Sequence, residues 1–167
     1  MVVLLPDNTQ LRVSYIMLTI KQGLKKRGLT LPKAPTPVGA YMATIRSENL
    51  LFISGQFPFI NGKLLYKGKI GKNLSTSEGY AAAELCAINI LSQLDTYLKN
   101  DQFKKLIKIQ GLINCGESFT EHAAVLDGAT NLLASILGEK SGHARSVIGC
   151  NSLPHDAAVE ITAIVEL

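Results

Sequence analysis

Tryptophan is absent from this chain of 167 residues, and aromatic residues make up only 6% of it. Proteins that bind single-stranded nucleic acid stack bases on aromatic side chains set among basic ones, and no stretch here has that composition. The formal charge of +4 is concentrated at one end: residues 1–33 carry six Lys and Arg against one Asp. Residues 34–167 carry eleven Lys and Arg against twelve Asp and Glu, a net charge of about −1. Such a body lacks the basic face that binds phosphates, so nucleic acid is not expected as a partner.

Cysteine is also scarce. Cys86, Cys115 and Cys150 are odd in number and widely spaced, and they form no C-x-x-C pair. The sequence therefore predicts neither a disulfide framework nor a zinc site, and it fits a reducing cytoplasm. The three histidines form no H-E-x-x-H or similar set, so no metal is expected. No apolar run approaches the roughly 20 residues that span a bilayer, so a soluble protein without a membrane partner is expected.

The motifs of several enzyme classes are missing as well. There is no G-x-S-x-G, and no spacing of Cys, His and Asp that indicates a catalytic triad. The glycines of residues 68–73 have neither the Walker spacing nor the dinucleotide-binding fingerprint, and they are more typical of a surface turn. The sequence therefore gives no sign of a covalent nucleophile or of a phosphate-binding loop.

What the chain does have is enough apolar residues, 47%, to build one compact domain. Residues 1–29 form a predicted N-terminal extension with a short basic amphipathic helix over 15–27, and Met17 is an alternative start of the protein. The predicted domain occupies residues 30–167. Its first eight residues include three prolines, which favours an extended lead-in.

Periodicity predicts an α+β fold for this domain. Two long helices are expected, one behind the capping-box sequence Ser75-Thr-Ser-Glu78 and one behind Ser118-Phe-Thr-Glu121 that ends at Gly138. Strands are expected at 41–45, 50–54, 105–113, 144–150 and 158–166, with a short one after the Asn61-Gly62 turn. This order favours one mixed sheet with both helices packed on one face. The other face needs a cover, which self-association would supply.

An arginine and a glutamate lie in the last two apolar runs. Charged side chains are rarely buried without a partner, because removing a charge from water costs several kcal/mol. Arg145 presents a planar fork that suits a small acid anion, although a structural salt bridge, even with Glu160 on a neighbouring strand, explains it equally well. Glu160 is either a half-buried carboxyl with a raised pKa that orients or deprotonates water, or the outward polar member of an alternating strand.

Two further places are candidates for contact with a ligand. Ser54 and Gly55 follow an apolar strand, where a glycine lets a ligand or a neighbouring backbone approach closely, although a bulge at the strand end is an equal explanation. Tyr41 offers a phenol near the first strand, although tyrosines more often pack with one satisfied hydroxyl. These residues alone leave the reaction open.

Several short segments within about residues 30–167 form a recognisable set. They are Gly39-Ala-Tyr41, Phe52-Ile-Ser-Gly-Gln56, Asn89, His143-Ala-Arg-Ser146, Leu153-Pro154 and Val159-Glu-Ile161. Together they resemble the RidA (YjgF/YER057c/UK114) family and, within it, the RidA-like or endoribonuclease L-PSP subgroup. The resemblance implies a chorismate-mutase-like α+β fold, assembled as a homotrimer with three clefts between subunits.

The resemblance also implies an activity. A reactive 2-imino or enamine acid, released by pyridoxal-phosphate enzymes, is hydrolysed to a 2-keto acid and ammonium. No cofactor is needed, because the imine carbon is already electrophilic. Carried over to this chain, Arg145 would hold the substrate carboxylate and Glu160 would position the attacking water. The backbone of Val147 would contact the reacting atoms, and the cleft would be lined, partly from the neighbouring subunit, by Tyr41, Ser54 and Gly55.

The chain departs from the family pattern at several positions, including Met42 and Ala43 where Ser or Thr and Gln are common. Ala40 replaces a common proline, Val147 replaces the cysteine after Arg-Ser, and Asp127 and Thr130 stand where Asn and Tyr are frequent on the second helix. The backbone of residue 147 can keep its role with valine in place of cysteine, but Asp127 would repel a second carboxylate if it faced the cleft.

Two other functions stay open: a non-catalytic trimer that binds small carboxylates, and an endoribonuclease. The net charge near −1 and the lack of a general acid/base pair disfavour the endoribonuclease.

Overall fold

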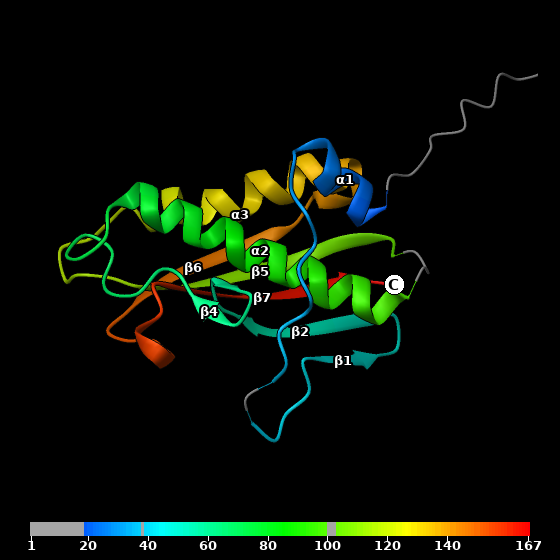
Figure 1. The fold of residues 1–167 in the computed structure, drawn as a ribbon, viewed down its shortest axis with the longest axis horizontal. Helices are drawn as coiled ribbons and strands as arrows, with labels where there is room; N and C mark the ends of the chain where they lie inside the picture. Colours follow the sequence, from blue (N-terminus) through cyan, green and yellow to red (C-terminus); the bar gives the residue numbers. More distant parts are fainter. Residues whose placement is uncertain (1–18, 38, 100–102) are drawn as a thin grey trace, which may run out of the picture.

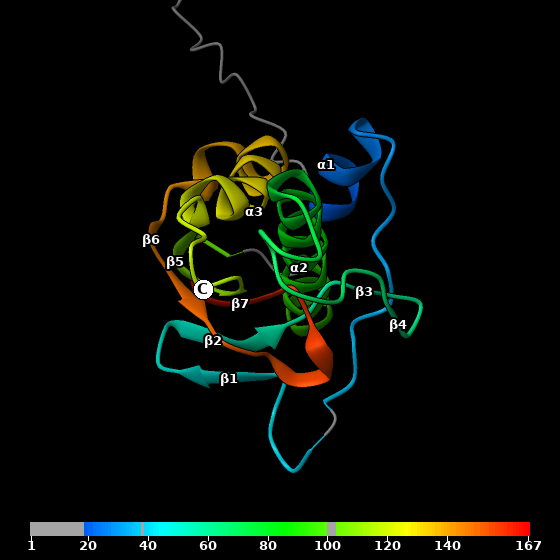
Figure 2. The ribbon, with the colours of Figure 1, turned by 90° about the vertical axis from the view of Figure 1, so that its left-hand side faces the viewer.

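The computed structural model describes residues 19–37, 39–99 and 103–167. Its centre is a five-stranded sheet in the order β1-β2-β7-β5-β6, in which β5 and β6 are parallel and the other neighbours antiparallel. The strands are β1 (Thr44–Ser47), β2 (Leu50–Gln56), β5 (Lys105–Asn114), β6 (Ala144–Cys150) and β7 (Val159–Glu166). Two helices, α2 (Thr76–Leu98) and α3 (His122–Leu137), cover one face of this sheet (Figure 1 and Figure 2). The predicted α+β class and element order are confirmed.

Smaller elements connect these parts. A hairpin of β3 (Phe59–Ile60) and β4 (Lys63–Leu64) turns at Asn61-Gly62, as the sequence predicts. Two short 3₁₀ helices, η1 (Gly138–Ser141) and η2 (Pro154–Asp156), lead into β6 and β7. The first strand begins three residues later than predicted, because the backbone bends around Gly39, whose carbonyl accepts a hydrogen bond from the Tyr41 amide at 2.9 Å.

Helix α2 begins as its sequence predicts. The Ser75 side chain accepts a hydrogen bond from the Glu78 amide, and the Glu78 carboxylate accepts one from the Ser75 amide at 2.8 Å. This reciprocal pair satisfies two backbone donors that a helix start otherwise leaves without partners. The two long helices pack closely: a Cβ atom added at Gly128 of α3 would lie 2.1 Å from the Tyr80 carbonyl oxygen of α2.

Helix α3 begins differently from the prediction. The capping box expected at Ser118 and Glu121 does not form, and Glu121 itself occupies the N-cap position without a capping hydrogen bond from its side chain. Its carboxylate instead accepts a hydrogen bond from the Thr76 hydroxyl at 2.8 Å. The glutamate therefore joins the beginnings of the two helices, a tertiary contact that local sequence does not encode.

The helix α1 (Ile20–Lys26) packs against α3. Leu24 is fully buried, and a Cβ atom at Gly23 would lie 2.8 Å from Ile136. Thr19 caps this helix; the predicted helical residues 15–18 and the alternative start at Met17 lie outside the described residues. The proline-rich segment then runs extended across α2 (Figure 1), where the Gln93 side-chain amide donates to the Pro35 carbonyl at 2.7 Å.

The second face of the sheet carries no helix within the described residues. Exposed apolar side chains lie on β1, β2 and β6, with Ile45 62%, Phe52 39% and Ile148 52% exposed. Solvated antiparallel sheets usually present polar side chains on such a face, so this composition favours contact with another protein surface. Among the helices that the structure describes, none has the length and hydropathy to cross a bilayer.

The two capping-box sequences give a paired test of the fold. Replacing Ser75 by Ala removes the acceptor for the Glu78 amide and is expected to lower the free energy of unfolding by about 1 kcal/mol. Replacing Ser118 by Ala removes no cap, so this control is expected to leave stability unchanged. Urea unfolding of both variants measures the difference; equal losses would contradict the assignment of the helix starts.

Candidate functional site

Arg145 lies on β6 at the edge of the sheet, on the face that the helices cover. It pairs in register with Ile109 of β5, whose side chain is fully buried beneath the helices. The guanidinium reaches α3, where Nη1 donates to Asp127 Oδ1 at 2.6 Å and to Thr130 Oγ1 at 3.2 Å. Arg145 is therefore held in a structural salt bridge, the second explanation considered for it, but its partner is Asp127 of α3 and not Glu160. Asp127 lies in the same cluster, as a partner of the arginine.

A chain of hydrogen bonds continues from Arg145 to the backbone. His143 Nδ1 lies 2.5 Å from the Ser141 carbonyl oxygen, and Nε2 lies 3.4 Å from Thr130 Oγ1. A carbonyl can only accept, so Nδ1 carries a hydrogen and donates it to Ser141. Thr130 Oγ1 accepts from Arg145 and lies within hydrogen-bond distance of His143 Nε2. This chain holds the guanidinium in place from the side of α3.

Glu160 lies on β7, on the opposite face. It pairs with Leu112 of β5, which also pairs with the exposed Ile148 of β6, so these three side chains cross the uncovered face in one row. Glu160 is half-buried, and burial raises the pKa of its carboxyl above its ordinary range. A carboxyl with a raised pKa can take a proton from water and return it near neutral pH.

Gly55 makes room for this carboxylate. The pairing of β2 with β7 shifts register between Ile53 and Gln56, which identifies a bulge at Ser54 and Gly55. A Cβ atom added at Gly55 would lie 1.7 Å from Glu160 Oε1. The bulge considered for this glycine is therefore confirmed, and the group that approaches it closely is the Glu160 side chain rather than a ligand or a neighbouring backbone.

Arg145 and Glu160 cannot meet within one protomer. Their strands are separated by β5, so they lie two strand spacings apart, about 10 Å, and about three residues apart along the strands. Their side chains also point to opposite faces of the sheet, since the row of Arg145 includes the buried Ile109 and that of Glu160 includes Leu112. A small ligand in contact with both groups therefore needs two copies of the chain.

The remaining predicted residues divide between these two places. Val147 is half-buried, packs against the core beside Arg145, and lies on the same strand face. Tyr41 and Gly55 line a hollow of about 50 Å³, which Gln93 of α2 also lines and to which Glu160 does not contribute. Ser54 is committed to the backbone, because its hydroxyl donates to the Met42 carbonyl at 2.7 Å and fixes the bend at residues 39–43.

His155 is a residue of this hollow that the sequence did not identify. Its imidazole lies edge-on to Phe57 and Phe59, with ring centroids 6.5 and 6.4 Å apart, and lines the same hollow as Tyr41. Its backbone φ of +60° is uncommon for a residue with a side chain. The sequence offered the histidines only as possible metal ligands, so His155 was not identified as a residue that lines a hollow. The signal that could have identified it is its position directly after Leu153-Pro154, one of the recognisable segments.

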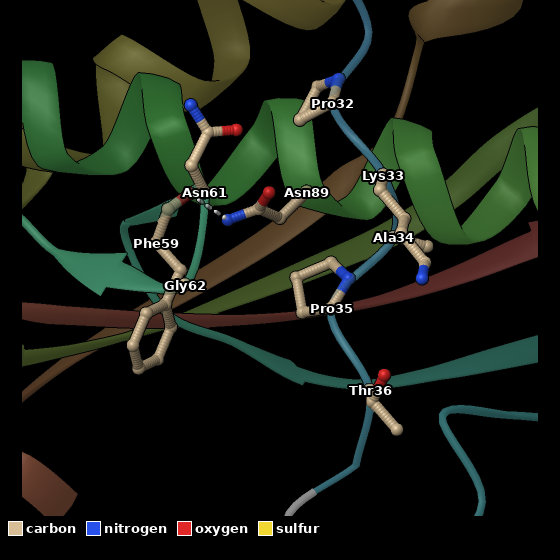
Figure 3. Close-up of a pocket in the computed structure, with 9 residues that line it drawn as sticks. All are labelled: Pro32, Lys33, Ala34, Pro35, Thr36, Phe59, Asn61, Gly62 and Asn89. Carbon is tan, nitrogen blue, oxygen red and sulfur yellow. Dashed lines mark hydrogen bonds between the residues drawn. The ribbon is translucent and has the colours of Figure 1, made fainter.

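A larger pocket of about 470 Å³ adjoins this hollow (Figure 3). It lies between the extended residues 32–36 and the β3–β4 hairpin, and shares Pro35, Thr36 and Phe59 with the hollow. Asn89 of α2 is buried behind it, and its side-chain amide donates to the carbonyls of Phe57 and Phe59 at 2.8 and 2.9 Å. Asn89 therefore holds the segment before the hairpin. No three metal-binding side chains come together within the described parts of the chain.

The fit between Gly55 and Glu160 can be tested directly. Replacing Gly55 by Ala is expected to push the flexible carboxylate away, which costs within about 1 kcal/mol of stability but exposes the group to water. The pKa of Glu160 should then fall toward its ordinary range, as followed by carboxyl-carbon NMR. Gly142→Ala is the control, since no atom lies within 4 Å of the added carbon. An unchanged Glu160 titration in Gly55→Ala would contradict this geometry.

Comparisons with known proteins agree with this architecture. The family described as "YjgF/chorismate mutase-like, putative endoribonuclease" matches residues 21–167. Protein TCP17 of Trypanosoma cruzi is 37% identical over 150 residues, covering 89% of this chain and 94% of that protein. Protein Atu1372 of Agrobacterium tumefaciens is 40% identical with a TM-score of 0.83, covering 89% of this chain and 92% of its own. A crystal structure described as a putative endoribonuclease of Shewanella oneidensis is 34% identical with a TM-score of 0.87, and the match covers 90% of this chain and 100% of that chain. The chain therefore belongs to the YjgF/RidA family.

Proposed function

We propose that this protein hydrolyses small reactive 2-imino or enamine acids to 2-keto acids and ammonium, without a cofactor. The observation that carries the proposal is the pair of groups described above: an accessible guanidinium and a carboxyl whose pKa burial raises. The Arg145 side chain is 33% exposed, and its hydrogen bonds within the described residues all use Nη1. The edge formed by Nε and Nη2 is thus available for a bidentate carboxylate.

In the proposed reaction, water adds to the imine carbon and the carbon–nitrogen bond breaks. Glu160 takes one proton from the water as the oxygen of the water bonds to C2, and it then passes this proton to the nitrogen. The hydroxyl proton of the resulting carbinolamine also goes to the nitrogen as the carbon–nitrogen bond breaks, so the nitrogen leaves as ammonium. An iminium acid and one water thereby give one keto acid and one ammonium ion, with no oxidation or reduction. The protein's task is to orient the substrate and the water and to stabilise the changing charge.

The proposal places the site between protomers of a homotrimer. Arg145 and Glu160 lie on opposite faces of their own sheet, so a cleft that uses both would take one from each of two neighbouring chains. The apolar side chains on the uncovered face, such as Phe52 and Ile148, support burial of that face in an oligomer. The three cysteines are free, which is consistent with the proposed cytoplasmic location.

Removal of the guanidinium tests the function. Arg145→Ala is expected to lower kcat/KM for imine hydrolysis at least about 30-fold, since losing a charge-paired carboxylate contact typically costs 2–5 kcal/mol. The assay couples an amino-acid oxidase, which generates the imine, to detection of the keto acid. Arg27→Ala is the matched control, because Arg27 donates to the exposed Ser135 of α3, and no hydrogen bond in the described residues links it to Arg145 or Glu160. Full activity in Arg145→Ala would contradict the proposal; keto-acid binding without turnover in the wild type would identify a binding protein instead.

A further inference from the structure

The pocket of about 470 Å³ beside the β3–β4 hairpin contains a buried hydrogen-bond acceptor. The acceptor is Oδ1 of Asn89, a residue of α2 that is 1% exposed. The side-chain nitrogen of Asn89 donates to the carbonyl oxygens of Phe57 and Phe59 at 2.8 and 2.9 Å, which uses both of its hydrogens. These partners can only accept, so they fix the orientation of the amide. The oxygen is therefore the amide atom left for the pocket (Figure 3).

Within residues 19–37, 39–99 and 103–167, the side chain of Asn89 makes no hydrogen bonds other than these two, so Oδ1 has no donor. In the same ranges no side-chain oxygen or nitrogen is both cut off from solvent and without a partner, so Oδ1 is reached from the pocket. The extended residues 32–36 form one wall, and two of them, Pro32 and Pro35, have no N–H to offer. An acceptor without a partner in a buried position costs free energy, so an occupant that donates to Oδ1 makes a hydrogen bond that the protein leaves unmade.

We infer that this pocket is a second ligand-binding site, which takes a small apolar molecule that carries an N–H donor and no positive charge. The donor is required by Oδ1. The apolar body is favoured by the rings of Pro35 and Phe59, which line the pocket. Among the described residues of its lining, Lys33 alone is charged, and a cation there disfavours a cationic ligand. Neither Arg145 nor Glu160 lines this pocket, so the inference does not depend on the proposed hydrolysis.

The nitrogen donor determines what the pocket rejects. A ligand that enters a pocket displaces water from the acceptors it covers, and a donor on the ligand replaces the hydrogen bond that is lost. An oxygen at the same place in an otherwise equal ligand would bring two acceptors together and leave both without a partner. Between two apolar molecules of one shape, the pocket should thus favour the one with N–H, whereas a purely apolar pocket would not.

Indole and benzofuran are two probes of nearly equal shape that differ at one ring atom, N–H against O. NMR titration of the full chain, followed at the backbone amides of Lys33, Ala34 and Asn61, measures their dissociation constants and shows where they bind. Indole should bind at least about tenfold more tightly, because benzofuran lacks the hydrogen bond and leaves a buried acceptor without a partner. If the pocket offered only apolar contact, benzofuran would bind at least as well, since it has no N–H to remove from water.

A variant of the pocket wall completes the test. Ala34→Phe places a ring in the pocket and should abolish the shifts that indole causes at Lys33 and Asn61. Ala123→Leu, at an exposed position of α3, is the control and should leave binding unchanged. Asn89 is kept in both variants, because its nitrogen holds the segment before the hairpin. Equal or tighter binding of benzofuran to the wild type overturns the inference, as do absence of indole binding up to its solubility and indole shifts that persist in Ala34→Phe.

Discussion

Side chains on a β-strand alternate between the two faces of the sheet, and that alternation determines what this protein can do. Arg145 shares its face with the buried Ile109, and Glu160 shares the other with Leu112. Shifting either strand by one residue would bring the two groups to one face, but would also move the apolar residues of that strand out of the core. The packing of the core therefore keeps the two groups apart within a chain, and a joint site requires a second chain.

The polar groups on the two faces are stabilised in different ways. On the helix side, Asp127 and Thr130 accept hydrogen bonds from Arg145, and Thr130 in turn contacts His143. The carboxylate of Asp127 compensates the charge of the arginine beside the core. On the uncovered side, Glu160 is half-buried over Gly55, and its ionised form is disfavoured. One group is thus held charged and oriented, and the ionised form of the other is disfavoured; the proposed hydrolysis uses both properties.

Local sequence was sufficient for the elements but not for the partners of the site. The alternation at residues 144–150 and the Ser75 capping box predict their strand and helix correctly, because both depend on neighbours in the chain. Contacts between distant segments were not predictable in this way: Glu121 binds Thr76 rather than capping its own helix, and Arg145 pairs with α3. Asp127 was identified through the resemblance, but its role as the partner of the arginine was visible only in the fold.

Complementation shows whether one site takes Arg145 and Glu160 from different chains. Arg145→Ala and Glu160→Gln should each lose most of the activity, but co-expressed in equal amounts they should form mixed oligomers with intact clefts. For random assembly about one quarter of the clefts carry both native groups, so about a quarter of the wild-type activity should return. Mixed oligomers, verified by mass, that remain inactive would contradict the claim.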